Sequence, residues 1–405
     1  MEYRKRIAED KVLKLSNVFP VVLVTGARQC GKTTMLTHLS RGNRTYVSLD
    51  SIRDRILAQD DPELFFQKYN TPIFIDEVQY APELFSYIKT IVDRNKVPGE
   101  FWLSESQDFM IMKGVSESLA GRMGIVRMHP MIYEEAIGET KNLLSDYSFD
   151  SLKSRQGSKL EINSAFEYVF RGGMPAVLGM NDDMRSEYFD AYVGTYLMKD
   201  AVEFGRVSDA VKFQRFLSVA ASQNTHAVNY ATLASGAGIS EPTAKEWLCL
   251  LEGMGVVWLL RPYYSNLLKR MIKSPKMYFY DTGLCAHICR MPSKDVLQNS
   301  AFAGEYFENL VVNLLKIKSD LISNPPGIFY YRDVDRNEID VVLEEFDGLR
   351  PLEIKLSANP DKNVVKRFSL LEKSGRDVKP GGIICLASEP SPLDAHNSII
   401  PMGLI

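Results

Sequence analysis

Short apolar runs alternate with amphipathic stretches between residues 21 and about 130. This alternation is typical of a parallel sheet flanked by helices, so we expect an α/β fold for the N-terminal part. Helical spacing is clearest over Lys32–Leu39 and Ala81–Asn95. Five strands are expected, at Val21–Thr25, Thr45–Leu49, Pro72–Asp76, Glu100–Ser104 and Gly124–Met128.

The pattern changes further along the chain, which at 405 residues is too long for a single core. Residues from about 150 to 225 are mostly helical in pattern, whereas 226–280 predict a helix-turn-helix followed by two strands. Residues 301–388 predict a helix, three strands, a second helix and a further strand. The polar stretches Ser145–Asn163 and Met291–Asn299 are candidate linkers.

A glycine-bounded loop follows the first expected strand. Residues 26–33 match the pattern G-x-x-x-x-G-K-[ST], in which backbone N–H groups surround a phosphate chain. The lysine reaches the β- and γ-phosphates, the threonine ligates Mg²⁺, and the next helix points its positive end at the phosphates. We therefore expect ATP with Mg²⁺ to bind here. The expected nucleotide-contacting residues are Gly26, Ala27, Arg28, Gln29, Cys30, Gly31, Lys32, Thr33 and Thr34.

Two adjacent acids end the apolar strand at residues 73–76. Asp76 is expected to hold Mg²⁺ together with Thr33, as a Walker-B aspartate does. Glu77 is expected to act as the general base on the attacking water, since a carboxylate can accept its proton. With Lys32, Glu77 forms the predicted catalytic centre. The adjacent glutamate favours hydrolysis over phosphotransfer to another acceptor.

Two further places are candidates for contact with the γ-phosphate. Ser106 or Gln107 follows the fourth strand, where a polar side chain can sense that phosphate. Arg122 precedes the fifth strand and has three interpretations. It contacts the γ-phosphate of the nucleotide bound to its own chain, it contacts the γ-phosphate of a nucleotide bound to a neighbouring subunit, or it is a surface arginine or part of a salt bridge.

Together these motifs resemble a family of prokaryotic AAA-type ATPases with a C-terminal domain of unknown function. The resemblance covers nearly the whole chain and implies architecture more than substrate. The chain departs from the family at Ser104-Glu105, where Thr-Gly usually precedes Ser-Gln, and an acid so near the phosphates would repel them. The segments that carry the resemblance are Thr25–Thr34, Tyr46–Asp50, Phe74–Gln79, Ser106-Gln107, Ser118–Arg122, Arg171–Pro175, Tyr278–Leu284 and Arg332–Lys355.

A winged helix is predicted in the third part of the chain. The segment Tyr230–Thr243 predicts a helix, a glycine turn and a second helix capped by Ser240. The strands Gly255–Leu260 and Lys269–Tyr280 would form the wing. Three glutamates against one lysine on the second helix disfavour base reading, so contact with DNA and contact with a protein partner stay equally open. Basic residues suited to phosphate contacts are Arg261, Lys269, Arg270, Lys273 and Lys276.

Acids and a lysine gather on a predicted C-terminal hairpin. Pairing its strands about the turn Asp347-Gly348 places residues whose numbers sum to 695 opposite each other. Asp340, Glu353 and Lys355 then share one face, where the two carboxylates can converge on one cation. The lysine would lower the pKa of a metal-bound water or stabilise a pentavalent phosphate.

This constellation resembles the PD-(D/E)xK nuclease fold. The resemblance implies that Glu305 or Glu308 is the helix acid, and that Asp340 and Glu353 complete a site for a second Mg²⁺ or Mn²⁺ ion. Glu353 and Lys355 would be the catalytic E-x-K pair. The alternative is a solvated face, or a nuclease-like fold kept as an inactive scaffold.

Composition narrows the setting. The net charge of -3 argues against a protein that coats nucleic acid as a whole. Five scattered cysteines fit a reducing compartment, and no apolar run approaches the roughly 20 residues that cross a bilayer. We therefore expect a cytoplasmic protein without membrane contact.

These inferences predict four parts and leave two functions open. Either an ATPase moves the C-terminal half on DNA, or a nucleotide-dependent switch binds a protein partner and the nuclease-like fold is inactive. The parts are a P-loop domain at 1–145, a helical lid or connector at 146–225, a winged helix at 226–290 and a nuclease-like α/β domain at 291–405.

Overall fold

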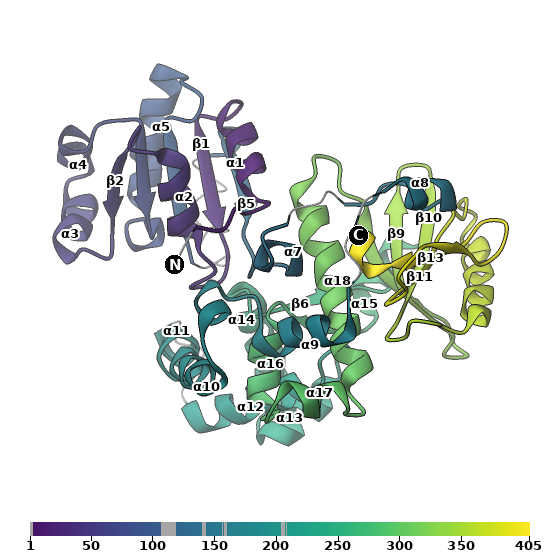
Figure 1. The fold of residues 1–405 in the computed structure, drawn as a ribbon. Coiled ribbons are helices and arrows are strands. Elements are labelled where there is room, and N and C mark those ends of the chain that lie inside the picture. The colour runs from purple at the N-terminus through teal and green to yellow at the C-terminus, as the bar shows by residue number, and fades with distance from the viewer. Residues whose placement is uncertain are drawn as a thin grey trace.

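The computed structural model describes residues 3–106, 119–139, 143–155, 157, 160–203, 207 and 209–405. Figure 1 shows an α/β domain formed by the N-terminal residues, a helical region beneath it and a second sheet at the C-terminal side. In the described residues, no helix combines the length and apolar character needed to span a bilayer.

The N-terminal sheet is built from five parallel strands in the order β2-β3-β4-β1-β5. Alternate residues of β1 enter two different cores, Val21 and Leu23 on one face and Val22 and Val24 on the other. The sheet is therefore covered on both sides, which explains the unbroken apolar run. The strands are β1 (Val21–Thr25), β2 (Thr45–Ser48), β3 (Ile73–Asp76), β4 (Phe101–Glu105) and β5 (Met123–Arg127).

The sheet expected from the sequence is confirmed, with strand ends shifted by one residue. Because β4 lies between β1 and β3, its C-terminal end reaches the same edge as the P-loop and the acids. Helices of this domain are α1 (Glu9–Ser16), α2 (Lys32–Ser40), α3 (Ile52–Asp60), α4 (Pro62–Lys68) and α5 (Leu84–Asn95), with a 3₁₀ turn η1 (Val78–Tyr80).

The middle of the chain is helical, as predicted. One continuous helix changes character along its length, from α10 (Asp182–Ala191) through the π-helical segment η3 (Tyr192–Leu197) to α11 (Met198–Glu203). The other elements are α7 (Tyr133–Ala136), α8 (Phe149–Ser154), α9 (Ile162–Arg171), η2 (Pro175–Gly179) and α12 (Ala210–Ser222).

A two-helix unit and a two-stranded sheet follow. Gly238 ends the first helix in the left-handed conformation, and the Ser240 hydroxyl accepts a hydrogen bond from the backbone N–H of Thr243 at 3.2 Å. The long second strand expected at Lys269–Tyr280 is wrong, because its first part is helical. The elements are α13 (Tyr230–Ala237), α14 (Glu241–Gly253), β6 (Val257–Leu260), α15 (Leu267–Ile272) and β7 (Lys276–Phe279).

The C-terminal sheet is mixed, in the order β12-β13-β11-β10-β9-β8. The predicted helix, three strands, helix and strand are present, with two more strands at the end. The elements are α16 (Thr282–Ile288), α17 (Lys294–Gln298), α18 (Ala303–Leu321), β8 (Gly327–Arg332), β9 (Glu338–Glu345), β10 (Gly348–Lys355), η4 (Lys362–Ser374), β11 (Gly382–Cys385), β12 (Ser391–Pro392), β13 (Ser398–Pro401) and η5 (Met402–Leu404).

The predicted register of the hairpin is wrong by two residues. Gly348 pairs with Glu345, so the paired numbers sum to 693 and the turn residues are Phe346 and Asp347. The segment around Asp377 lies against the start of this strand: its carbonyl accepts from the backbone N–H of Leu349 at 2.8 Å, and a Cβ on Gly348 would lie 2.7 Å from the same oxygen. A two-residue shift preserves which side chains share a face.

Asp281 joins two segments that are distant in the sequence. Its buried carboxylate accepts hydrogen bonds from the backbone N–H groups of Gly173 (2.9 Å), Met174 (3.0 Å) and Leu284 (2.7 Å). Gly172 has φ +87°, and a Cβ there would lie 2.3 Å from Asp281 Oδ1. The glycines before Met174 therefore allow the backbone to approach this acid closely.

We expect Asp281→Ala to lower the free energy of unfolding by about 3 kcal/mol or more, because three buried N–H groups lose their acceptor. Denaturant unfolding of the purified variant measures this. The matched control is Asp295→Ala, at a side chain that is 82% exposed, which should change stability by about 0.5 kcal/mol or less. Equal effects of the two variants would contradict the role of Asp281.

Candidate functional site

The P-loop leaves a buried strand and enters a helix. Gly26 has φ +146°, and a Cβ there would lie 1.9 Å from the backbone oxygen of Met128. Gly31 has φ +98° and precedes α2 directly. Glycine is therefore required at both ends of the loop. The ammonium group of Lys32 lies across the loop and donates to the carbonyls of Gly26 and Ala27, both at 2.9 Å.

The structure brings Thr33 and Asp76 together. The Thr33 hydroxyl lies 3.0 and 3.1 Å from the two carboxylate oxygens of Asp76, which is also hydrogen-bonded by Ser104 and by Tyr46 at 3.3 Å. Burial raises the pKa of Asp76, while the hydroxyl donors oppose that change. A threonine oxygen beside a carboxylate is a donor set that suits Mg²⁺.

Glu77 lies next to Asp76 in a left-handed backbone conformation, with φ 57°. This conformation is uncommon for a residue with a side chain and often marks a functional position. Both carboxylate oxygens of Glu77 lie 2.7 Å from the Ser106 hydroxyl, and one also accepts from the Gln79 amide. Ser106 thus contacts the predicted base. Its neighbour Gln107 lies outside the described residues.

Arg122 lies at the opposite end of the sheet. Its carbonyl accepts from Val21 at the start of β1, so the length of that strand, about 16 Å at roughly 3.3 Å per residue, separates it from the P-loop. The guanidinium is paired with Asp93 at 2.5 Å. A γ-phosphate contact within the same chain is therefore wrong for this fold. Contact with a neighbouring subunit stays a prediction.

The side chains in the middle of the P-loop contact the helical region rather than the phosphate cradle. Arg28 forms an ion pair with Asp200 on α11 at 2.7 Å, and Gln29 accepts a hydrogen bond from Tyr188 on α10. The turn between α14 and β6 also touches the loop, since a Cβ on Gly255 would lie 3.1 Å from the Ala27 nitrogen. These positions offer a nucleotide only their backbone groups.

A 320 Å³ cavity opens beside the loop, next to Gly31 and Thr34. Its other walls come from the N-terminal segment and from η2, including Tyr3, Pro175 and Leu178. The cavity is of the size that small-molecule sites have. It adjoins the first turn of α2, where Thr34 was expected to contact the nucleotide.

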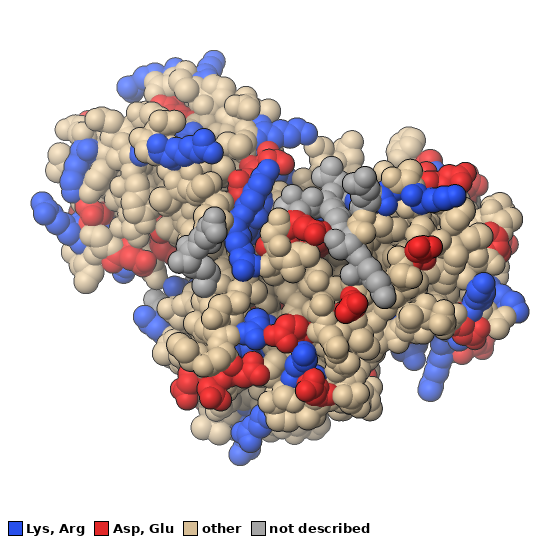
Figure 2. Space-filling model, viewed as in Figure 1, with Lys and Arg blue, Asp and Glu red and all other residues tan. Residues whose placement is uncertain are grey.

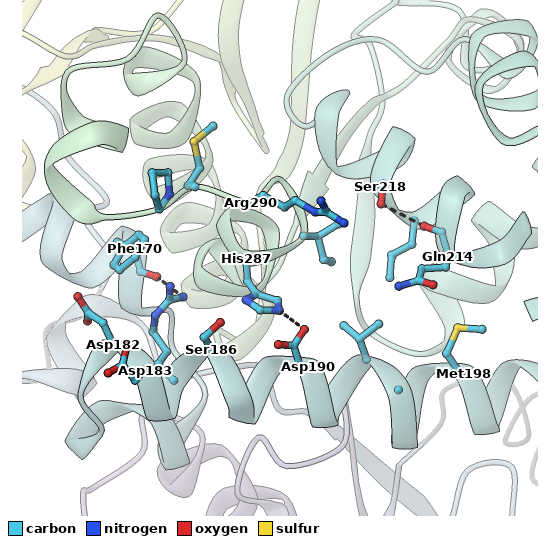
Figure 3. A pocket seen from close by; sticks show the side chains of 17 residues that line it. Phe170, Asp182, Asp183, Ser186, Asp190, Met198, Gln214, Ser218, His287 and Arg290 are labelled. Atoms are coloured by element: carbon cyan, nitrogen blue, oxygen red, sulfur yellow. Dashed lines mark hydrogen bonds and ion pairs between the residues drawn. The ribbon is translucent and has the colours of Figure 1, made fainter. Parts of the chain in front are cut away.

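A larger cavity of 660 Å³ lies away from this site, between α9, α10, α12 and α16 (Figure 3). His287 and Asp190 point toward each other within it and lie 3.0 Å apart, and Arg185 donates to the carbonyl of Phe170. None of the predicted site residues lines this cavity. One wall of this cavity is α10, the helix that also contacts the P-loop through Tyr188.

The C-terminal hairpin does gather Asp340, Glu353 and Lys355. The Lys355 ammonium lies 2.8 Å from Glu353 and 3.3 Å from Asp340. Burial, together with the charge of Asp340, raises the pKa of Glu353 to about 8. Asp340 also accepts a hydrogen bond from the backbone of Ile354 at 2.8 Å.

The helix acid near this group is Glu308 and not Glu305. Burial raises the pKa of Glu308, and the charge of Asp340 acts in the same direction. Glu305 instead lies 3.7 Å from His226, so of the two candidates it is Glu308 that the structure places beside Asp340. Sequence spacing did not separate the two, because both lie on the same helix.

A second buried lysine completes the acidic cluster. Lys276 on β7 lies 3.1 Å from Glu308 and 2.6 Å from Glu338. Its burial opposes a charge, but the surrounding carboxylates raise its pKa. Across the described part of the chain, no three or more His, Cys, Asp or Glu side chains are arranged to hold a metal ion. Lys276 lies between the carboxyl groups of Glu308 and Glu338, and Lys355 lies between those of Asp340 and Glu353.

Comparisons with known proteins divide the chain into three matched regions. Residues 18–137 match an AAA domain, 162–295 match a domain of unknown function, DUF8612, and 303–405 match a further one, DUF4143. The chain is 27% identical over 375 residues to uncharacterized proteins of Mycobacterium tuberculosis and Mycobacterium bovis, covering 92% of this chain and 78% of theirs. Among solved structures, the Walker-type ATPase PABY2304 of Pyrococcus abyssi is similar with a TM-score of 0.43 and 12% sequence identity. The matched region covers 71% of this chain and 96% of that protein.

The AAA match and the site define the N-terminal part as a P-loop ATPase domain. Three contacts of the site were not apparent from the sequence: Tyr46, Ser104 and Gln79. Tyr46 and Ser104 come from the strands on either side of β3, and Gln79 lies two residues after the base. Only the strand order could have indicated the first two.

We expect Glu353→Gln to gain stability relative to the wild type as the pH rises from about 4.5 to about 8. In that window the folded Glu353 keeps its proton and the unfolded one has lost it, so folding of the wild type alone becomes less favourable. The gain should be about 1–4 kcal/mol, at about 1.4 kcal/mol per pKa unit. Urea unfolding across this pH range tests it, with the exposed Glu389→Gln as control. Parallel curves for wild type and Glu353→Gln would contradict the assignment.

Proposed function

We propose that this chain is a Mg²⁺-dependent ATP hydrolase whose nucleotide state is passed to its helical and C-terminal parts. One arrangement supports this most directly. Lys32, Thr33, Asp76 and Glu77 meet at one edge of the sheet, and the loop that carries the first two is in direct contact with α10 and α11 through Gln29 and Arg28. Chemistry at the loop and movement of these helices are therefore physically linked.

In the proposed reaction the chain's own residues bind and orient the reactants. Lys32 leaves the loop carbonyls and places its charge on the β- and γ-phosphates, while the backbone N–H groups of the loop surround them. Thr33 and Asp76 would hold Mg²⁺, which neutralises charge on the phosphates. Glu77 accepts a hydrogen bond from the attacking water and takes its proton, and Ser106 fixes the direction of the carboxylate.

For the C-terminal half, the charge distribution favours a protein-binding switch over action on DNA. Two of the five basic residues assigned to phosphate contact are buried in ion pairs, Arg270 with Glu344 and Lys276 with Glu308. Figure 2 shows acidic and basic side chains intermixed over the face in view. A DNA-binding surface needs free cations along the phosphate backbone.

The acidic cluster supports the same choice. Lys276 and Lys355 already pair with the acids that would share a metal ion, and Glu353 keeps its proton up to a pH of about 8. A buried carboxylate needs one partner of opposite charge, and a lysine meets that need without a metal. We therefore propose that the nuclease-like fold is an inactive scaffold. The α13–α14 unit with its two-stranded sheet, proposed to be a winged helix, would offer the partner-binding surface.

Substitutions at the P-loop should separate binding from turnover. Lys32→Ala should weaken ATP binding by about tenfold or more, because a buried charge that contacts the phosphates is lost. Glu77→Gln should bind ATP like the wild type but turn over at least about 100-fold more slowly, since an amide cannot accept the proton. Equilibrium binding and phosphate release measure the two effects. Unchanged turnover in Glu77→Gln would exclude this residue as the base.

A cleavage assay tests the proposed absence of nuclease activity. Plasmid and linear duplex DNA are incubated with the full-length protein and Mg²⁺ or Mn²⁺, with and without ATP. We expect no cleavage and no stimulation of ATP turnover by DNA. Cleavage that persists in the wild type and disappears in Glu353→Gln would overturn the scaffold proposal and restore the metal-dependent nuclease.

A further inference from the structure

A buried arginine from the N-terminal segment contacts the P-loop backbone. Arg6 is only 4% exposed, and each of its side-chain nitrogens has a different partner. Nη1 donates to the carbonyl of Cys30 at 2.7 Å, Nη2 to the carbonyl of His129 at 2.7 Å, and Nε to the carboxylate of Glu135 at 3.0 Å. The guanidinium thus joins the loop to the segment that follows β5.

Arg6 itself is firmly held. Glu135 is 1% exposed, and the oxygen that receives Arg6 also accepts from the backbone N–H of Ile7 at 2.7 Å. Its second oxygen accepts from Ile132 at 3.0 Å. The backbone N–H of Arg6 donates to Glu9 at 2.6 Å. Both ends of the residue are therefore fixed, so the guanidinium has little freedom to follow a moving loop.

The contact with Cys30 has a consequence for the next residue. The carbonyl of Cys30 and the N–H of Gly31 belong to one planar trans peptide, in which they point in opposite directions. Because Arg6 draws the carbonyl toward itself, the N–H of Gly31 is turned away from Arg6. Gly31 has φ +98°, a conformation that glycine adopts without strain, and Arg6 Nη1 lies 3.4 Å from where a Cβ of this residue would stand.

We propose that Arg6 is a positioning residue for ATP, which fixes the peptide between Cys30 and Gly31 so that its N–H faces the phosphates. The inference rests on the proposed function, since it presumes phosphates in the loop. Arg6 acts through the backbone and has no contact with the reacting atoms. A lysine could not replace it, because one ammonium group cannot reach three acceptors in a planar fan.

The test compares five full-length proteins: wild type, Arg6→Gln, Arg6→Ala, Arg6→Lys and Arg4→Gln. Arg4 lines the same cavity beside the loop and controls for loss of a positive charge near the nucleotide. Affinity is measured for ATP and for inorganic tripolyphosphate. We expect Arg6→Gln to bind both about tenfold or more weakly, as for loss of a hydrogen bond to a charged group. Arg6→Lys should be nearly as weak, and Arg4→Gln close to the wild type.

Three results decide the matter. Equal loss for ATP and tripolyphosphate, partly restored to Arg6→Ala by free guanidinium ion while the melting temperature stays constant, supports the inference. Wild-type affinity in a folded Arg6→Gln, or equal loss in Arg4→Gln, overturns it and leaves the ATPase proposal intact. Failure of the wild type to bind ATP or tripolyphosphate overturns both.

Discussion

The conformation of the loop between Gly26 and Lys32 is the constraint on which the rest of the site depends. Gly26, Gln29 and Gly31 adopt positive φ, and fixing a loop of this kind in one shape costs conformational entropy. Here the shape is imposed from outside. Arg6 holds a carbonyl, Tyr188 and Asp200 hold side chains, and Gly255 packs on the backbone. A rearrangement of the loop therefore changes its contacts with the N-terminal segment, with α10 and α11, and with the turn before β6. A nucleotide that binds one loop conformation more tightly will also favour one position of these elements.

A second constraint is electrostatic and lies in the C-terminal sheet. Charged groups are costly to remove from water, and burying several carboxylates together is tolerated only when cations are buried with them. Lys276 enters this cluster from β7, outside the sheet, so the acids also tie the two-stranded unit to the C-terminal domain. The segment that contains Tyr147 is also joined to the C-terminal sheet, because the Arg350 guanidinium lies over the Tyr147 ring. The parts of the chain share buried charges as well as apolar surface.

The sequence was a good guide wherever a motif and its local structure coincide. The apolar runs located all five strands of the first sheet, and the glycine pattern located the loop and the adjacent Thr33. Pairing across space was less accessible. The hairpin register depended on Asp377 packing against Gly348, and the choice between Glu305 and Glu308 depended on helix rotation. Arg6 lies in a segment without a motif, and only the folded N-terminal segment brings it to the site. Tyr46 lies in a segment that carries the family resemblance, but its contact with Asp76 follows only from the strand order.

The π-helical segment η3 sets the rotational phase of the long helix. Tyr188 and Asp200 are twelve positions apart, and in a regular α-helix at about 100° per residue they would point about 120° apart. The i→i+5 bonding of residues 192–197 underwinds the helix, so the second half is rotated back toward the first. Both side chains can then reach adjacent residues of one loop. Recovery of normal winding would swing Asp200 around the axis while Tyr188 stayed in place, so a change of twist, without bending or translation, would be enough to release one contact and keep the other.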